Sequence, residues 1–111
     1  MIKDLTTYLG TKNFLFSKFD KIEPKQLNSR KKIDIYSSTD IKKHFISIFI
    51  INSKSRFLIK NAKEIIELQN RLVLFEGHNF KKNIIIIQSP LCSKAKQYLK
   101  ENRWIVYDDF M

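Results

Sequence analysis

The chain has 111 residues, of which 43% are hydrophobic and 29% charged, the length and composition of one soluble globular domain. Its single cysteine excludes an internal disulfide, and its two glycines exclude a glycine-rich nucleotide-binding loop. The first residues lack a signal-peptide pattern, and the apolar runs are too short to span a bilayer. We therefore expect a cytoplasmic protein with a single domain over residues 1–111 and no membrane partner.

The charge is strongly positive. Twenty-one Lys and Arg against eleven Asp and Glu give a net charge of +10, which favours a polyanion as the partner. Thirteen of the basic residues, but only four acidic ones, lie between Lys12 and Lys63. Nucleic acid is the leading partner class, whereas a membrane surface, an acidic protein or a biased amino-acid usage stay open as alternatives.

The first half of the chain predicts short elements followed by a hairpin. A helix over residues 4–9 ends at Gly10, a strand covers residues 14–19, and residues 22–30 form a loop. Alternating apolar residues predict a strand over 33–37, Ser38 to Asp40 predict a turn, and the β-branched run 45–51 predicts a second strand. These two strands should pair as an antiparallel hairpin.

The second half predicts alternating helices and strands. A helix over residues 58–75 is ended by Gly77, and four successive isoleucines predict a buried, parallel strand over 83–88. Ser89 and Pro90 favour the start of a helix that runs to about residue 102, followed by a strand over 104–107. This order predicts an α/β domain with a mixed sheet, in two or three layers. The aromatic residues are expected mainly in the core rather than stacked on bases: Tyr36, Phe57, Tyr98, Trp104 and Tyr107.

One constellation could carry chemistry. Asp34 lies at the start of the first hairpin strand and Lys54 follows the end of the second, so antiparallel pairing brings them together. A carboxylate there could hold Mg²⁺, and a lysine could orient the attacking water or neutralise charge during phosphodiester hydrolysis. Asp34 could equally be a solvent-facing strand residue beside basic neighbours.

The segment Lys32-Ile-Asp-Ile-Tyr, the run from Phe45 to Arg56, and the helix and apolar strand that follow resemble the PD-(D/E)XK, restriction-endonuclease-like nuclease fold. The likeness is to archaeal Holliday-junction resolvases and small restriction-type endonucleases, and it extends over residues 31–107. It implies Asp34 and Lys54 as catalytic residues, Mg²⁺ or Mn²⁺ as cofactor, DNA rather than RNA as substrate, and a homodimer as the assembly to test.

Asn52 departs from that family, because it stands where the family has a glutamate. An amide brings no negative charge to a hard cation. Either the domain binds without cutting, or the second metal-binding acid comes from the next helix, where Glu67 has a better reach than Glu64. The alternative for both glutamates is a solvated helix face of paired charges.

Three functions stay open: a metal-dependent nuclease, a nuclease-like accessory domain that only binds, and a protein-interaction module with an acidic partner. The start of the third helix, around Ser89, could hold an anion with its free amides. Cys92 is expected on the buried face of that helix, although the helix dipole could lower its pKa. The residues expected to contact nucleic acid are Arg30, Lys31, Lys32, Asn52, Lys54, Arg56 and Lys60.

Overall fold

The structure is a computed structural model, and it describes residues 10, 16–27, 29 and 33–108. The helix expected over residues 4–9 and the three basic residues Arg30, Lys31 and Lys32 lie outside this described part. Within the described part, no helix combines the length and the apolarity that crossing a bilayer requires.

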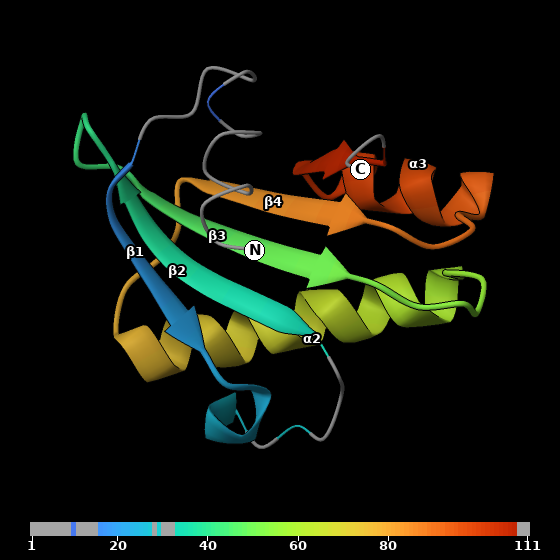
Figure 1. Cartoon of the computed structure of the whole chain (residues 1–111), viewed down its shortest axis with the longest axis horizontal. Coiled ribbons are helices and arrows are strands. Elements are labelled where there is room, and N and C mark those ends of the chain that lie inside the picture. The colour runs from blue at the N-terminus through green and yellow to red at the C-terminus, as the bar shows by residue number, and fades with distance from the viewer. Residues whose placement is uncertain (1–9, 11–15, 28, 30–32, 109–111) are drawn as a thin grey trace.

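Five strands form one mixed sheet in the order β1-β2-β3-β4-β5 (Figure 1). The antiparallel pairs join β1 to β2 and β2 to β3, and the parallel pairs join β3 to β4 and β4 to β5. This arrangement confirms the expected hairpin and the parallel β-α-β-α-β unit. The strands are β1 (Phe16–Ile22), β2 (Asp34–Asp40), β3 (Phe45–Ile51), β4 (Lys82–Ile87) and β5 (Trp104–Tyr107).

Two helices make the parallel crossovers, α2 (Ile59–Glu76) between β3 and β4, and α3 (Ser93–Glu101) between β4 and β5. The residues between β1 and β2, expected as a loop, contain the short 3-10 helix η1 (Pro24–Leu27). Gly77 ends α2 as expected. Its φ of 77° is a left-handed conformation that glycine adopts without strain, and its N–H donates to the carbonyl of Val73 at 2.9 Å.

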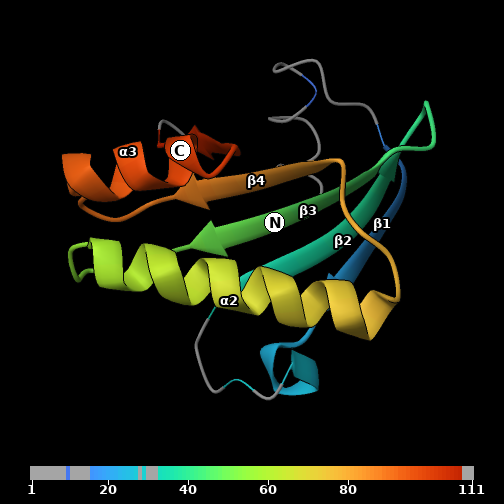
Figure 2. The ribbon, with the colours of Figure 1, turned by 180° about the vertical axis from the view of Figure 1, so that it is seen from behind.

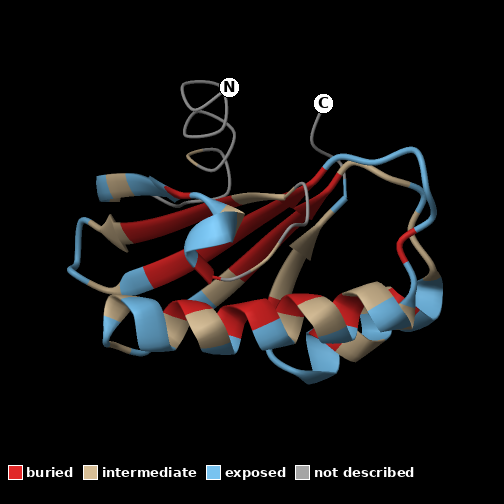
Figure 3. Ribbon diagram, turned by 90° about the horizontal axis from the view of Figure 1, so that it is seen from below, coloured by how far each residue is buried: buried red, intermediate tan, exposed pale blue. Residues whose placement is uncertain are grey.

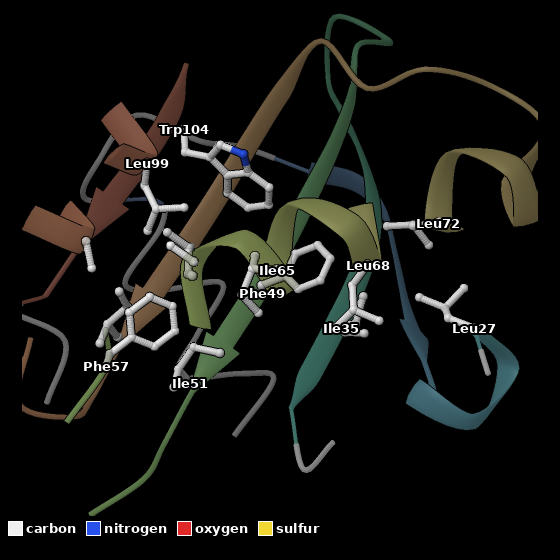
Figure 4. Close-up of a cluster of buried hydrophobic side chains, with 14 of the residues drawn as sticks. Leu27, Ile35, Phe49, Ile51, Phe57, Ile65, Leu68, Leu72, Leu99 and Trp104 are labelled. Carbon is white, nitrogen blue, oxygen red and sulfur yellow. The ribbon is translucent and has the colours of Figure 1, made fainter. Parts of the chain in front are cut away.

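Both faces of the sheet are buried, but the two described crossover helices lie on the same face (Figures 2 and 3). The larger core cluster packs side chains of α2 and α3 against one face, and it includes Phe49, Ile65 and Trp104 (Figure 4). The second cluster covers the other face and consists of strand residues: Tyr36, Ile46, Ile48, Ile50, Ile84 and Ile86. The isoleucines of β4 divide between the two clusters, as expected of a strand buried on both faces.

Most of the aromatic residues expected in the core are there. Tyr36, Phe57 and Trp104 are buried, whereas Tyr98 and Tyr107 are partly exposed and pack against the two clusters. Burial raises the pKa of the Tyr36 hydroxyl, and the charge of Asp34 raises it further. The three buried rings are therefore not available to stack on bases.

The prediction of a turn at Ser38 to Asp40 is wrong, because β2 continues through Asp40. The Ser38 hydroxyl is buried and donates to the carbonyl of Ile46 at 2.7 Å, so this polar side chain is satisfied inside the sheet. Asp40 closes the real turn: its Oδ1 accepts the N–H groups of Lys42 at 2.9 Å and His44 at 2.8 Å.

The helix start expected at Ser89 and Pro90 is also wrong, because α3 begins at Ser93. The chain between β4 and α3 stays extended, since Leu91 forms a parallel bridge with Phe57. The carbonyl of Pro90 accepts the N–H of Phe57 at 2.7 Å. A long-range pairing between two loops therefore overrides a local helix signal.

Candidate nucleic-acid interface

The candidate interface is the edge of the sheet where β3 and β4 end, named here the carboxyl edge. It consists of residues 52–58, residues 88–92, and the first turns of α2 and α3. Figure 1 shows both helices starting at this edge, beside the arrowheads of β3 and β4. Helix N-termini carry a partial positive charge and N–H groups without intrahelical partners, so both helices favour anions here.

Backbone hydrogen bonds tie the two loops of the carboxyl edge together. The N–H of Gln88 donates to the carbonyl of Ile51 at 2.7 Å, which extends the β3–β4 ladder by one step. Farther along, the carbonyl of Phe57 accepts the N–H of Cys92 at 3.0 Å. The side chain of Phe57 is buried, so it anchors the loop to the core. The edge is a fixed surface rather than two independent loops.

A cavity of about 360 Å³ opens at this edge between the end of β3 and the first half of α2. Its apolar part comes from the core, and its polar part carries amides, hydroxyls, one guanidinium and one carboxylate. The lining residues are Ile33, Ile51, Asn52, Ser53, Ser55, Arg56, Phe57, Asn61, Glu64, Ile65 and Ser89.

Asn61 organises the α2 side of the cavity. Its Oδ1 accepts the N–H of Leu58 at 2.9 Å, and its Nδ2 donates to Glu64 Oε1 at 3.3 Å. Ser53 plays a similar part in the β3 loop, where its hydroxyl oxygen accepts the N–H of Ser55 at 3.0 Å. Sequence reasoning missed Asn61; its signal is an amide three residues after the residue that precedes the helix, where it can cap the first turn.

Two side-chain oxygens just after β4 are buried without a hydrogen-bond partner in the described part of the chain, Gln88 Oε1 and Ser89 Oγ. Ser89 Oγ lines the cavity, so a ligand or water there would satisfy it. Sequence reasoning named Ser89 through an incorrect helix start and missed Gln88. The signal for Gln88 is its place as the first polar residue after four isoleucines.

Asp34 lies at this edge, as the hairpin predicted, because it pairs with Ile50 near the end of β3. Side chains alternate along a strand, so Asp34 shares its face with Tyr36, on the side of the sheet away from α2 and α3. Its carboxylate lies 3.6 Å from Lys21 Nζ of β1. Asp34 does not line the cavity, although its neighbour Ile33 does.

The expected cationic residues in the described part lie at the same edge as the cavity, and Arg56 is the one of them that lines it. Lys54 and Arg56 project from the exposed loop after β3, and Lys60 lies in the first turn of α2. Arg56 lines the cavity, as does Asn52, the residue that replaces the family's glutamate. Lys94, in the first turn of α3, adds a further exposed positive charge. The structure therefore brings Asn52, Lys54, Arg56 and Lys60 to one edge.

The structure does not bring Glu67 to Asp34. Glu67 is 65% exposed on α2, and its Oε1 accepts a hydrogen bond from Arg71 Nη2 at 2.7 Å. Arg71 also donates through Nη1 to the carbonyl of Leu27 in η1, at 3.1 Å. Asp34 lies on the opposite face of the sheet from α2. Glu64, one turn earlier, is the glutamate of this helix that reaches the cavity.

The carboxylates at the carboxyl edge do not fit a Mg²⁺ site as they are placed. Asp34 is paired with Lys21, Glu64 is on the other side of the sheet, and Asn52 is uncharged. Among residues 10, 16–27, 29 and 33–108, no three His, Cys, Asp or Glu side chains form a group that could hold a metal ion. A hard cation prefers several carboxylate oxygens at one point.

The pKa of the Cys92 thiol reflects the groups around it at the carboxyl edge. Cys92 precedes α3, and the backbone N–H groups of Ala95 and Lys94 hold the pKa of its thiol below the ordinary value, with the charges of Arg56 and Lys94 adding to the effect. The thiol is partly exposed rather than fully buried. A site that stabilises a thiolate also stabilises other anions.

The fold that carries these features is an α/β fold with a five-stranded mixed sheet. The chain is similar to the solved structure of EndoMS in its apo form, with a TM-score of 0.56 and 14% identity over 86% of this chain. It is also similar to a repair endonuclease from Pyrococcus abyssi, with a TM-score of 0.50 and 16% identity over 83% of this chain. Such identities show the fold alone. The chain spans 37% and 38% of those two chains. Comparison with protein-family models and with curated proteins finds no match.

Proposed function

We propose that this chain binds nucleic acid, chiefly DNA, at the carboxyl edge of β3 and β4. The observation that supports the proposal is that cationic side chains, two helix N-termini and a cavity lined by Arg56 all lie at this one edge. Lys54, Arg56 and Lys60 would contact phosphates, and Asn52 would donate its amide N–H to a phosphate oxygen or a base. Arg30, Lys31 and Lys32 join the proposal through the sequence, since they lie two to four residues before Asp34.

The fold and the net charge support this proposal. One structural neighbour is described as a repair endonuclease, and this is a motive to test DNA as the ligand of this chain. A net charge of +10 attracts any polyanion, but the paired loops and the cavity give one edge a fixed shape. Phosphate contacts by such a surface should be largely independent of base sequence.

The test is fluorescence anisotropy with a labelled DNA duplex at several salt concentrations. Affinity should fall steeply between about 50 and about 200 mM salt, since each neutralised phosphate contributes close to one unit of slope in log–log form. Arg56→Ala should reduce that slope by about one and weaken binding to all sequences alike. Lys18→Ala, on the edge strand β1, is the matched control. Binding that is absent at low salt, or insensitive to salt, would contradict the proposal.

Metal-dependent DNA cleavage is the second candidate. The observation that favours it is the pairing of Asp34 with Ile50, which puts a carboxylate at the corner from which the Lys54 loop departs. In this hypothesis Asp34 and Lys54 are catalytic, Mg²⁺ or Mn²⁺ is the cofactor, and α2 supplies the second acid. Glu64 is a better candidate than the expected Glu67, because Glu64 lines the cavity.

The carboxylate arrangement favours binding without cutting, and a cleavage assay decides between the two. Labelled plasmid and branched DNA are incubated with Mg²⁺ or Mn²⁺, beside the variants Asp34→Ala, Lys54→Ala, Glu64→Gln and Glu67→Gln. We expect binding but no cleavage. Metal-dependent cutting that Asp34→Ala and Lys54→Ala abolish, in proteins with unchanged thermal unfolding, would establish a nuclease instead, and the two glutamine variants would identify its second acid.

A further inference from the structure

The opposite end of the sheet carries a second distinctive surface, named here the hairpin end. It comprises residues 41–45, which contain the turn between β2 and β3, and residues 74–82, which contain the end of α2 and the start of β4. Figures 1 and 2 show these segments at the same end of the molecule, away from the carboxyl edge, with the β2–β3 turn and the end of α2 on separate sides of that end. Because β3 has seven residues, the two ends are about 20 Å apart along that strand.

Apolar side chains are exposed at the hairpin end to an unusual degree. Five large hydrophobic side chains are exposed in the described part of the chain, and four of them belong to this end. Leu74 is 82% exposed, and the others are Ile41 at 60%, Phe75 at 48% and Phe45 at 40%. Exposed apolar side chains that gather in one region indicate a protein-binding surface, whereas scattered ones do not.

The centre of this surface is a fixed aromatic stack. The ring of Phe45 stacks on His78 with a centroid distance of 3.8 Å and an interplanar angle of 20°, and His78 lies 4.9 Å from Phe80. The carbonyl of Phe45 accepts the N–H of Lys81 at 2.8 Å, which joins β3 to the loop before β4. The ring of Phe45 is already held in place, so binding of a partner to it would cost little conformational entropy.

The hairpin end is also cationic. Lys42, Lys43 and Lys81 carry exposed positive charge there, and Glu76, which is partly exposed, is the acidic residue of the 74–82 segment. The carboxylate of Asp40 does not pair with these lysines. Its Oδ1 accepts two N–H groups of the turn, and its Oδ2 lies 3.4 Å from His44 Nδ1. The exposed lysines outnumber the carboxylates at this end, so an acidic partner surface complements it.

We propose that the hairpin end binds an acidic segment of another protein, in which apolar side chains alternate with carboxylates. The carboxylates would pair with the lysines while the apolar side chains would cover Phe45 and Leu74. A nucleic-acid backbone has no apolar groups to cover an exposed leucine, so the exposed aliphatic side chains favour a protein over DNA. A second copy of this chain would bring the same positive charges against each other. This inference does not depend on nucleic-acid binding at the carboxyl edge.

The test uses two synthetic peptides of equal length and equal glutamate content. One has leucine and phenylalanine between the glutamates, and the other has glycine and serine. Binding of each labelled peptide to the whole chain is measured by anisotropy, with a DNA duplex as competitor. Leu74→Ser is a variant that leaves the fold intact because this side chain is largely in water; Phe45→Ser is accepted after its thermal unfolding is checked.

We expect the apolar acidic peptide to bind about tenfold more tightly than the glycine–serine peptide, and Leu74→Ser and Phe45→Ser to remove that advantage. Lys42→Glu/Lys43→Glu should weaken both peptides, whereas Lys54→Glu/Arg56→Glu should weaken neither beyond a general charge effect. Equal binding of the two peptides, or no binding of either, would overturn the proposal. Displacement of the peptide by DNA, with loss of DNA binding in Lys42→Glu/Lys43→Glu, would assign this end to nucleic acid instead.

Discussion

Replacement of Phe49 by alanine should lower the free energy of unfolding by about 3–5 kcal/mol, the cost of a large cavity in a closed core. Phe49 lies on the central strand β3 and has no exposed surface. Its ring meets Trp104 of β5 edge to face, with a centroid distance of 5.5 Å and an angle of 71°. Figure 4 shows it between the sheet and α2, so its loss removes contacts on both sides.

Phe45→Ala is the matched control for Phe49→Ala, because it makes the same change four residues earlier on the same strand. Phe45 keeps two fifths of its surface in water and loses its stack on His78, so its truncation should cost about 1–2 kcal/mol. Urea unfolding followed by circular dichroism measures both values. Equal costs for the two variants would show that the buried cluster around Phe49 is not the main source of stability.

The strands were predictable because their sequence patterns match where they lie. Ile84 to Ile87 form an unbroken apolar run, and the structure buries two of them on each face of the sheet. The run 45–51 was predicted with its observed bounds for the same reason. Local patterns suffice where a strand is covered on both sides, since every position then selects an apolar residue.

The errors came from polar residues whose partners are distant in sequence. Ser38 resembles a turn residue, yet its hydroxyl is satisfied by Ile46 across the hairpin. Ser89 and Pro90 resemble a helix start, yet the pairing of Leu91 with Phe57 holds the chain extended. In both cases the competing interaction joins segments that only the folded chain brings together.

The same reasoning explains which part of the site was predictable. The approach of Asp34 to the end of β3 follows from a hairpin register, which a sequence can specify. The choice between Glu64 and Glu67 depends on the rotation of α2 about its axis against the sheet. Three residues on a helix change the direction of a side chain by about 60°. Here that difference separates a cavity residue from one paired with Arg71 in solvent.

Reversing both charges of the β3 loop, in Lys54→Glu/Arg56→Glu, should lower the affinity for duplex DNA by about 100-fold at about 50 mM salt. Two lost phosphate contacts account for most of this decrease, because each contact releases condensed counterions. The loss should shrink by about tenfold at about 200 mM salt, where counterion release contributes less. Both residues are exposed, so the fold should tolerate the change.

The matched control is Lys42→Glu/Lys43→Glu, which removes the same net charge from the opposite end of β3. It should weaken DNA binding only several-fold, through the general loss of positive potential. Anisotropy titrations of both variants at the two salt concentrations separate a local contact from a charge effect. Equal losses in the two variants would mean that DNA responds to net charge alone, and the carboxyl edge would then lose its place as the interface. A selective loss in Lys54→Glu/Arg56→Glu would instead tie binding to the loop after β3, where Arg56 lines the cavity together with residues of the first half of α2.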